Sequence, residues 1–480
     1  MNWYQQILAC SFIGQVFSQV TVPLHGHSIA SHLQKRDAIH ELLYNLQDVF
    51  LVGEVKVDNK TLRMVFDTGS ADFWVKQDPC TLNPVKTRFD EILNKTIPIT
   101  HDFSCEPFQF RGINTSDTKT MKKFLNDAVT LNYHSASATV NLYTAEVQFG
   151  EFKLPDLIIG VGYDLLKLEF VDGIVGLGLP ELSPIAKKLV NSSFTSEDVL
   201  KTNFIDYIIT NKIAGASYPQ FGVYISNSED YDGSEITIGG TNPAKYKGTP
   251  KTFSVDRSKG IWGTDPDGWT IEVDGVSFPR PLVNNSTVIS VDTGSSAIYL
   301  HHKTATIINA QLGATFNTTD GRDYFPNCNL TGKPALVLKA KGHTFYIPAE
   351  NLYIPDVNDS SRCLSAVGRV LDKHPVVLGI AFLRSYYSVY TLGRNPSITF
   401  FQSIHDYEYG LKLVQKHIKN LSLQLEIRAD YEALFGMVPF GKLSTDDIKL
   451  QLLKYRQREQ EYFLKIFPVK NSFSFDPNQF

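Results

Sequence analysis

The sequence predicts an all-β core between about residue 50 and residue 400, followed by a helical C-terminal extension. Short runs of β-branched, aromatic and other apolar residues recur along this stretch, and Asp-Gly or Gly-Gly pairs separate several of them. Helical periodicity is scarce over the same region and becomes regular only beyond residue 401. With 480 residues, 42% of them hydrophobic, the chain can bury a large core in two to four structural units.

Within the core, nine segments have the composition of strands and two have the pattern of short helices. The helices are predicted at residues 184–190 and 204–210, the first with Ser183 as its N-cap and Pro184 in its first position. The strands are predicted at residues 50–57, 62–66, 128–133, 139–149, 234–238, 269–273, 287–291, 336–339 and 388–392.

Residues 402–480 have a different pattern from the core. Apolar residues fall at helical spacing in two runs, 411–425 and 448–466, and Ser444 followed by Thr-Asp-Asp is a predicted N-cap for the second. We therefore predict an amphipathic helical extension whose apolar face docks on the body of the protein or on a partner. Residues 473–480 lack the long hydrophobic tail that a lipid-anchor signal requires.

The N-terminus carries two processing signals. Residues 7–17 form a short, mostly apolar stretch, which predicts a signal peptide over residues 1–18; the alternative is an ordinary buried segment. The dibasic pair Lys35-Arg36 is either a cleavage site before Asp37 or a solvated surface pair.

Five cysteines are present, and Cys10 lies in the predicted signal peptide. The other four form one local pair in each half of the chain, 25 and 35 residues apart, without Cys-x-x-Cys or cysteine–histidine spacing for zinc. We predict the disulfides Cys80–Cys105 and Cys328–Cys363, each worth ~2–4 kcal/mol, with four buried free thiols as the alternative.

The chain has ten Asn-x-Ser/Thr sequons, whereas chance would supply roughly three or four. This excess predicts a glycoprotein that is secreted or, alternatively, delivered to a lysosomal or vacuolar lumen. The sequon asparagines are Asn59, Asn94, Asn114, Asn191, Asn284, Asn285, Asn317, Asn329, Asn358 and Asn420.

Composition also excludes several classes of function. With 46 Lys+Arg against 50 Asp+Glu the net charge is −4, so no nucleic-acid partner is expected. No run of 18 or more apolar residues exists, which excludes a multi-pass membrane protein and a stable membrane anchor. The twelve histidines, among them the adjacent pair His301-His302, show no metal-ligand spacing and are interpreted as surface or incidental residues, so neither a metal nor another cofactor is expected.

The most informative feature is an internal repeat of the motif Asp-Thr-Gly-Ser. Its copies begin at residues 67 and 292, and each follows a mostly apolar strand. A single Asp-Thr-Gly at a strand end usually marks only a turn, but two copies in the same context are hard to reach by accident. The repeated residues are Asp67, Thr68, Gly69, Ser70, Asp292, Thr293, Gly294 and Ser295.

Each residue type in this motif suits a paired-carboxylate site. The strands deliver the two aspartates to a common axis, threonine can lock the loops by hydrogen bonds, and glycine allows close backbone approach. Serine donates its hydroxyl to the outer carboxylate oxygen. Two carboxylates in hydrogen-bonding contact share a proton, so their apparent pKa values belong to the pair. Such a pair can deprotonate a water for attack on an amide carbonyl and protonate the departing nitrogen.

From residue 49 to residue 401 the chain resembles the pepsin-like aspartic proteases. Five segments carry the resemblance in the family's order: 66–75, 172–178, 236–240, 291–296 and 377–387. It implies a bilobal fold with two related β-rich lobes, at residues 37–245 and 246–401, around a central cleft. It also implies an aspartic endopeptidase that cleaves polypeptide substrates at acidic pH, with Asp67 and Asp292 as the catalytic pair.

The resemblance also suggests a short propeptide and a flap over the cleft. In this family a dibasic step some thirty residues before the first catalytic aspartate often ends a propeptide, which favours a propeptide over residues 19–36. The matching flap residues are Tyr133, His134 and Ser135, and the histidine replaces the family's glycine. His134, charged at a pH below ~6.5, either favours acidic side chains near the scissile bond or points into solvent.

Two alternatives to an active enzyme remain. The first is a catalytically silent binding protein on the same fold; silent relatives usually lose an active-site aspartate or glycine, and both loops are intact here. The second is an interaction protein whose helical extension docks a partner.

Overall fold

The computed structural model covers residues 1–480. The residues that it describes are 39–46, 50–78, 86–90, 95–99, 112–133, 136–150, 152–166, 172–213, 216, 218–227, 234–273, 276–278, 288–318, 321–329, 335–355 and 362–405.

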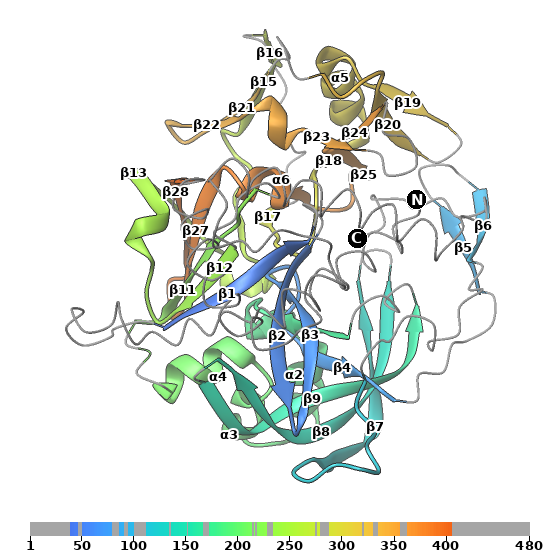
Figure 1. Ribbon diagram of the computed structural model, residues 1–480, viewed down its shortest axis with the longest axis vertical. Helices are drawn as coiled ribbons and strands as arrows, with labels where there is room; N and C mark the ends of the chain where they lie inside the picture. The colour runs from blue at the N-terminus through green and yellow to red at the C-terminus, as the bar shows by residue number, and fades with distance from the viewer. Residues whose placement is uncertain are drawn as a thin grey trace, which may run out of the picture.

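A 13-stranded sheet joins the two halves of the chain (Figure 1). Near the end of the described chain, β27 pairs with β11 and β28 pairs with β27, so segments far apart in sequence share one sheet. In spatial order the strands are β13 (Tyr246–Ser254), β28 (Ser397–Ser403), β27 (Tyr386–Thr391), β11 (Gln220–Tyr224), β12 (Ser234–Ile238), β1 (Ile39–Leu46), β2 (Phe50–Val57), β3 (Lys60–Asp67), β10 (Gly173–Gly176), β4 (Phe73–Lys76), β9 (Phe152–Leu166), β8 (Ser137–Phe149) and β7 (Lys122–Asn132).

Four smaller sheets complete the described β structure, and three of them belong to the second half of the chain. One sheet contains β14 (Gly263–Thr264), β17 (Ile289–Val291), β26 (Val376–Leu378), β18 (Ile298–His301) and β25 (Val367–Val370); another contains β16 (Val276–Phe278), β15 (Thr270–Val273), β21 (Leu336–Ala340) and β22 (His343–Ile347); the third contains β19 (Thr315–Asn317), β20 (Arg322–Phe325), β24 (Cys363–Ser365) and β23 (Tyr353–Pro355); and β5 (Lys86–Asp90) pairs with β6 (Lys95–Ile99).

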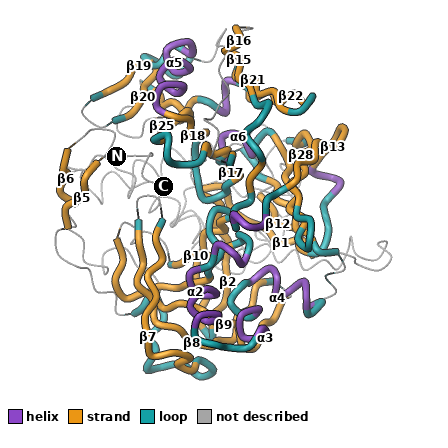
Figure 2. Tube along the Cα trace, turned by 180° about the vertical axis from the view of Figure 1, so that it is seen from behind, coloured by secondary structure: helices purple, strands orange, loops and turns teal. Residues whose placement is uncertain are grey.

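The helices are short and are spread over the molecule, with α6 (Ile380–Leu383) near its middle (Figure 1). In Figure 2, α2 to α4 lie towards the end formed by β7 to β9, and α5 lies at the opposite end. The α-helices are α2 (Pro184–Asn191), α3 (Ser196–Leu200), α4 (Phe204–Thr210), α5 (His302–Leu312) and α6 (Ile380–Leu383), and the 3₁₀ helices are η3 (Pro180–Leu182), η5 (Pro243–Lys245), η6 (Arg257–Lys259) and η7 (Ala349–Asn351).

The predicted predominance of β structure is confirmed, and each predicted strand overlaps an observed one. The helices predicted at 184–190 and 204–210 are also present. Ser183 caps α2, because its hydroxyl accepts the N–H of Ala186 at 2.8 Å. The extension over residues 402–480 lies outside the described residues beyond His405.

The sequence-based assignment missed helix α5. Its sequence, HKTATIINAQL, contains four β-branched residues, and His301 at its N-cap makes no capping hydrogen bond. The helix is stabilised by packing instead, because Ala305, Ile308 and Leu312 are buried on one face. Tertiary contacts thus override a weak local preference.

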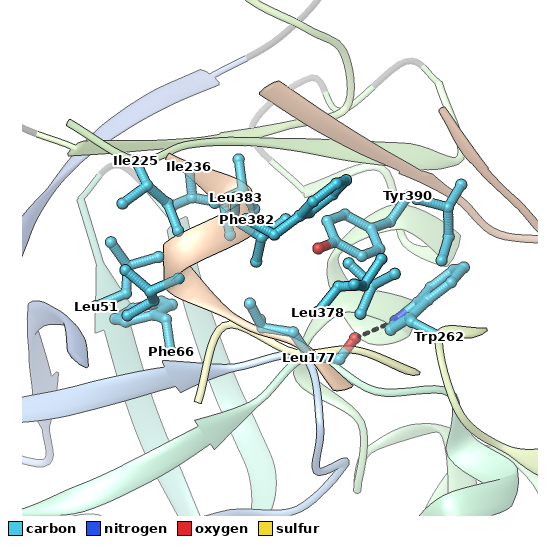
Figure 3. Packing of buried hydrophobic residues seen from close by; sticks show 14 of the residues in the cluster. Leu51, Phe66, Leu177, Ile225, Ile236, Trp262, Leu378, Phe382, Leu383 and Tyr390 are labelled. Atoms are coloured by element: carbon cyan, nitrogen blue, oxygen red, sulfur yellow. Dashed lines mark hydrogen bonds between the residues drawn. The ribbon is translucent and has the colours of Figure 1, made fainter. Parts of the chain in front are cut away.

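A continuous apolar core connects the two halves of the chain at the level of the large sheet. Figure 3 shows Phe66 and Leu177 from the first half packed near Leu378 and Phe382 from the second. At one side Trp262, fully buried, donates its indole N–H to the carbonyl of Leu177 at 2.8 Å. Phe66 and Val291, the residues directly before Asp67 and Asp292, both belong to this core.

Two further findings bear on the sequence predictions. The structure contains the predicted disulfide between Cys328 and Cys363, which links β24 to the segment after β20. Cys80 and Cys105 lie outside the described residues. In the part of the chain that is described, no helix is long and apolar enough to cross a membrane.

Candidate active site

Two strand ends bring Asp67 and Asp292 together. Asp67 ends β3, and Asp292 directly follows β17. Each strand lies beside a parallel neighbour, β10 for β3 and β26 for β17. A backbone hydrogen bond also links each aspartate to this neighbouring strand. The N–H of Leu177, the residue after β10, donates to Asp67 O at 2.8 Å. The N–H of Asp292 donates to the carbonyl oxygen of Leu378, the last residue of β26, at 3.1 Å. Each aspartate is therefore supported from behind by a parallel strand of its own half, although the two backbone bonds run in opposite directions.

The threonines of the two motifs lock the loops to each other. The N–H of Thr68 donates to Thr293 Oγ1, and the N–H of Thr293 donates to Thr68 Oγ1, both at 3.0 Å. Each hydroxyl then donates across the interface, Thr68 Oγ1 to Val291 O at 2.9 Å and Thr293 Oγ1 to Phe66 O at 2.7 Å. Both threonines are fully buried, so losing one partner would leave an unsatisfied polar group that costs about 1–3 kcal/mol.

Each carboxylate receives the same two hydrogen bonds from its own loop. Asp67 Oδ1 accepts the N–H of Gly69 at 2.7 Å, and its Oδ2 accepts the hydroxyl of Ser70 at 2.5 Å. Asp292 repeats this pattern with Gly294 N–H at 2.8 Å and Ser295 Oγ at 2.7 Å. These bonds fix the plane of each carboxyl group.

The glycines are required because each lies against the opposite aspartate. A Cβ atom on Gly69 would stand 2.5 Å from Asp292 Cγ, and one on Gly294 would collide with the carboxyl of Asp67. Any side chain at either position would force the carboxyl groups apart. The backbone of each glycine therefore approaches the opposite carboxyl closely, as the sequence predicts.

The pair is placed where both carboxyls cannot easily be charged. Asp67 is 7% exposed, whereas Asp292 is half-buried. Burial, then the negative charge of Asp292, then a hydrogen bond between the two carboxyls raise the pKa of Asp67 well above its ordinary value, and the bonds from Ser70 and Gly69 offset only part of this rise. The arrangement favours one proton shared by two carboxyls.

Of the predicted flap, Tyr133 lies in the described chain, whereas His134 and Ser135 fall outside it. Tyr133 follows β7, and its hydroxyl accepts the indole N–H of Trp74 at 2.7 Å. Burial and the negative charges of Asp72 and Asp67 raise the pKa of Tyr133, so its phenol stays neutral. The hairpin of β7 and β8 thus holds Tyr133 close to the Asp67 loop.

Sequence reasoning did not single out Asp72, which is buried behind the first loop. Its Oδ1 accepts the hydroxyl of Ser183 at 2.5 Å and the N–H of Ile185 at 3.3 Å, which ties the loop to the start of α2. Burial raises the pKa of Asp72 to about 6. A charged residue flanked by Ala71 and Phe73 in an apolar context was the signal that could have identified it.

Other predicted sites fall into two groups. Asn59, Asn114, Asn191 and Asn329 are exposed and Asn317 is half-buried, whereas Asn94, Asn284, Asn285, Asn358 and Asn420 lie outside the described residues. No group of three or more His, Cys, Asp or Glu residues within the described chain could hold a metal ion.

Of the pair His301-His302, interpreted from the sequence as surface or incidental, only one histidine lies on the surface. His302 is exposed, but His301 is 5% exposed and its Nε2 lies 3.1 Å from the carbonyl oxygen of His374. His301 is the last residue of β18, and packing of α5 after it buries the ring.

On a predominantly β fold, two similar loops bring two carboxyls together, and burial together with the charge of Asp292 raises the pKa of Asp67. The family model "Eukaryotic aspartyl protease" matches residues 52–402, and the chain belongs to this family. Rhizopuspepsin-4 from Rhizopus niveus is 26% identical over 363 residues, which cover 73% of this chain and 76% of that protein. Cathepsin E from Rattus norvegicus is 25% identical over 370 residues, covering 74% and 81%.

A solved structure shows the same fold. The crystal structure of the aspartic proteinase from Irpex lacteus aligns with a TM-score of 0.57 at 20% sequence identity, covering 77% of this chain and 98% of that one. This likeness concerns the fold alone.

The electrostatics of the pair predict an unusual dependence of stability on pH. Because the pKa of Asp67 is raised in the folded protein, the folded state loses stability as the pH rises from about 4 towards neutral. Asp67→Asn should therefore raise the free energy of unfolding at pH 7 by on the order of 1 kcal/mol or more, and by much less at pH 3.5. Denaturant titrations at the two pH values measure this difference.

Asp58 provides a control of opposite sign. Burial acts to raise its pKa, but hydrogen bonds from the side chain of Thr120 and from the N–H groups of Lys119 and Thr120 outweigh burial and lower it. Asp58→Asn should cost stability at pH 7 and little at pH 3.5. If Asp67→Asn instead lowers the free energy of unfolding at pH 7, as Asp58→Asn should, the pKa of Asp67 is not raised in the folded protein.

Proposed function

We propose that this chain is an aspartic endopeptidase that hydrolyses peptide bonds with a water molecule activated by Asp67 and Asp292. The observation that carries the proposal is the reciprocal lock of Thr68 and Thr293, which holds two carboxyls in hydrogen-bonding contact. A silent binding protein would have no need for this costly arrangement of buried acids. Membership of the aspartyl protease family supports the same reading.

The proposed reaction needs only the pair, a water and the substrate amide. The ionised carboxylate takes a proton from the water as the water oxygen bonds to the carbonyl carbon, and the protonated carboxyl gives its proton to the carbonyl oxygen. The resulting tetrahedral diol then returns a proton to one carboxylate, while the C–N bond breaks and the departing nitrogen receives a proton from the other carboxyl. The pair ends with one proton, as it began.

This cycle sets the working pH. The pair is competent with one proton, and it loses activity when both carboxyls are protonated or both are ionised. Burial and the neighbouring charge of Asp292 raise the pKa of Asp67, which favours the protonated form of this member of the pair. Hydrolysis should accordingly be best in acid.

We propose that Tyr133 lies over the bound polypeptide, in a cleft between lobes at residues 37–245 and 246–401. Its bond from Trp74 leaves the phenolic proton free to be donated to substrate or towards Ser70. His134, next to it, would carry a positive charge in acid and favour acidic side chains near the scissile bond. The alternative for His134 is a ring that points into solvent.

Replacing either aspartate by asparagine should abolish hydrolysis. Asp67→Asn or Asp292→Asn removes half of the shared-proton pair, and general acid–base catalysis alone is worth ~10²–10⁴-fold. Turnover of a denatured protein at acidic pH, with cuts mapped by mass spectrometry, measures the loss. The matched control is Asp72→Asn, since Asp72 is also buried near the first loop but makes no bond to the pair.

Asp72→Asn should keep most of the activity, whereas each dyad variant should fall below a few per cent of it. Turnover above that level in a folded dyad variant would contradict the assignment of the catalytic pair. Circular dichroism on each variant separates loss of chemistry from loss of fold.

We also propose that the protein enters the secretory route, with a signal peptide at residues 1–18 and a propeptide at residues 19–36, and that it is glycosylated at exposed sequons. Strand β1 supports the position of cleavage. It begins at Ile39, two residues after Asp37, and pairs with both β12 and β2. Among the described residues, the sheet therefore starts just after Arg36. Delivery to a lysosomal or vacuolar lumen is the alternative destination.

The mature protein should begin at Asp37. Cleavage after Lys35-Arg36 would leave β1 intact, whereas cleavage beyond Leu46 would remove it from the sheet. N-terminal sequencing of material secreted by a eukaryotic host tests this directly. Fully active protein that begins at Gln19 or Val20 would contradict it, and Arg36→Ala should block the cleavage.

The extension over residues 402–480 is proposed to be dispensable for the chemistry and to dock through its apolar helical faces. The chain leaves the sheet at an anchored point. Ile404 N–H donates to Lys245 O at 2.9 Å, and His405 Nε2 lies 2.7 Å from the carbonyl oxygen of Arg384. These contacts hold the end of β28 without involving the aspartate loops.

A further inference from the structure

The hairpin of β7 and β8, which carries Tyr133, is irregular along its outer strand β7. Lys123 of β7 pairs with Tyr143, and Leu125 pairs with Leu142, the residue directly before Tyr143. Phe124 is therefore an extra residue that stands opposite no residue of β8. Such a β-bulge redirects the side chain of the extra residue away from the regular ladder.

A second and larger bulge follows directly in the same strand. Between the pairs Leu125–Leu142 and Val129–Val140, three residues of β7 stand opposite a single residue of β8. These three residues, 126–128, are exposed. Among the described strands β7 also lies at the edge of its sheet, so β8 is its one ladder neighbour. Its position must therefore depend on contacts outside the ladder.

Both bulges contact the α2 segment, which we define as residues 183–194. The ring of Phe124 packs against the ring of Phe194, just after α2, with centroids 5.2 Å apart. In the second bulge, Asp127 Oδ2 accepts a hydrogen bond from Lys188 Nζ of α2 at 2.8 Å. This bond and the charge of Lys188 lower the pKa of Asp127, so the ion pair persists in mild acid. The bulged residues of β7 are thus those that contact the α2 segment.

An apolar cluster fills the space between the α2 segment and the hairpin. It is separate from the core shown in Figure 3, so α2 rather than that core covers this side of the hairpin. Phe124 and Phe194 pack against its margin. Its buried members from β7, β8 and α2 include Val129, Leu131, Val140, Leu142, Ile185 and Leu189.

The other end of the α2 segment is attached to the first catalytic loop. Ser183, the N-cap of α2, donates its hydroxyl to Asp72 Oδ1 at 2.5 Å, and Asp72 follows the Asp67 loop directly. Asp72→Asn would leave this attachment in place, because asparagine keeps the Oδ1 acceptor. Tyr133 follows β7 and accepts the indole N–H of Trp74, which lies two residues after Asp72. The loop, the α2 segment and the hairpin therefore form a closed ring of contacts.

We propose that Phe194 is a positioning residue for the flap: by packing on Phe124 it fixes the bulged strand β7 on the α2 segment and so holds Tyr133 over the catalytic pair. This inference rests on the proposed function. A strand that is free to move must be ordered when substrate binds, and this ordering weakens binding. Phe194 orders β7 before substrate arrives, so its loss should act on KM.

The test compares Phe194→Ala with Phe401→Ala on a short peptide substrate. Phe401 is the matched control, because it is also half-buried and packs on another aromatic ring, that of Tyr246 at 4.3 Å, but it lies on β28, near the other end of the strand order. Phe194→Ala should raise KM about threefold to tenfold and leave kcat within about twofold. Phe194→Tyr, which keeps the ring, should restore KM, and Phe401→Ala should change neither constant.

A double-variant cycle tests whether the effect passes through Phe124. Phe124→Ala should raise KM as much as Phe194→Ala does, and the double variant should be no worse than either single variant. Increases in KM that multiply in the double variant would overturn the inference, because the two rings would then act independently.

A second readout needs no catalysis. Hydrogen exchange of the backbone amides in residues 128–133, followed by mass spectrometry, reports how firmly the outer strand is held. Phe194→Ala and Phe124→Ala should each speed exchange there by about threefold or more, whereas Phe401→Ala should not. Exchange and KM that match those of the parent protein, or an equal effect of Phe401→Ala, would overturn the inference.

The two proposals fail in different ways. If the parent protein cleaves no peptide while Phe194→Ala still speeds exchange in residues 128–133, the proposed function fails and the fastening of β7 stands. If the parent protein cleaves peptides and Phe194→Ala changes neither KM nor exchange, only the positioning role fails.

Discussion

The rest of the site depends on the reciprocal hydrogen bonds between Thr68 and Thr293. Each threonine uses its N–H and its hydroxyl across the boundary between the two halves of the chain, so neither loop can satisfy its buried polar groups without the other. Individually such bonds are worth about 1 kcal/mol. As a closed set in a dry environment they act together and leave the two carboxyls little freedom to separate.

The fold supplies what this lock cannot supply alone. Parallel neighbours support each aspartate from behind, and the core of Leu177, Trp262 and Leu378 keeps water away from the threonines. The 13-stranded sheet, which takes strands from both halves, holds this core together. Two acids that would repel each other in water are thus kept in contact by structure that extends well beyond the loops. The cost of burying them appears as the raised pKa of Asp67.

Sequence predicted the β core and the pairing of the two motifs, because both depend on local signals that repeat. The apolar residues before each Asp-Thr-Gly-Ser motif are enough to predict a strand there. The repeat of the motif implies that the two aspartates share a site. The sequence did not predict α5, whose β-branched residues favour strand and which packing makes helical. Nor did it predict Asp72, because the role of this residue depends on Ser183, 111 residues away.

A double-mutant cycle on the two threonines tests the central claim most directly. Thr68→Val and Thr293→Val keep the shape of each side chain and remove its hydroxyl, and kcat/KM for a short peptide is measured for the parent, both single variants and the double variant. If the lock works as one unit, each single variant loses nearly all that the double variant loses, with a coupling free energy of about 1–3 kcal/mol. Losses that simply add would contradict the account, since they would mean that each threonine holds only its own loop.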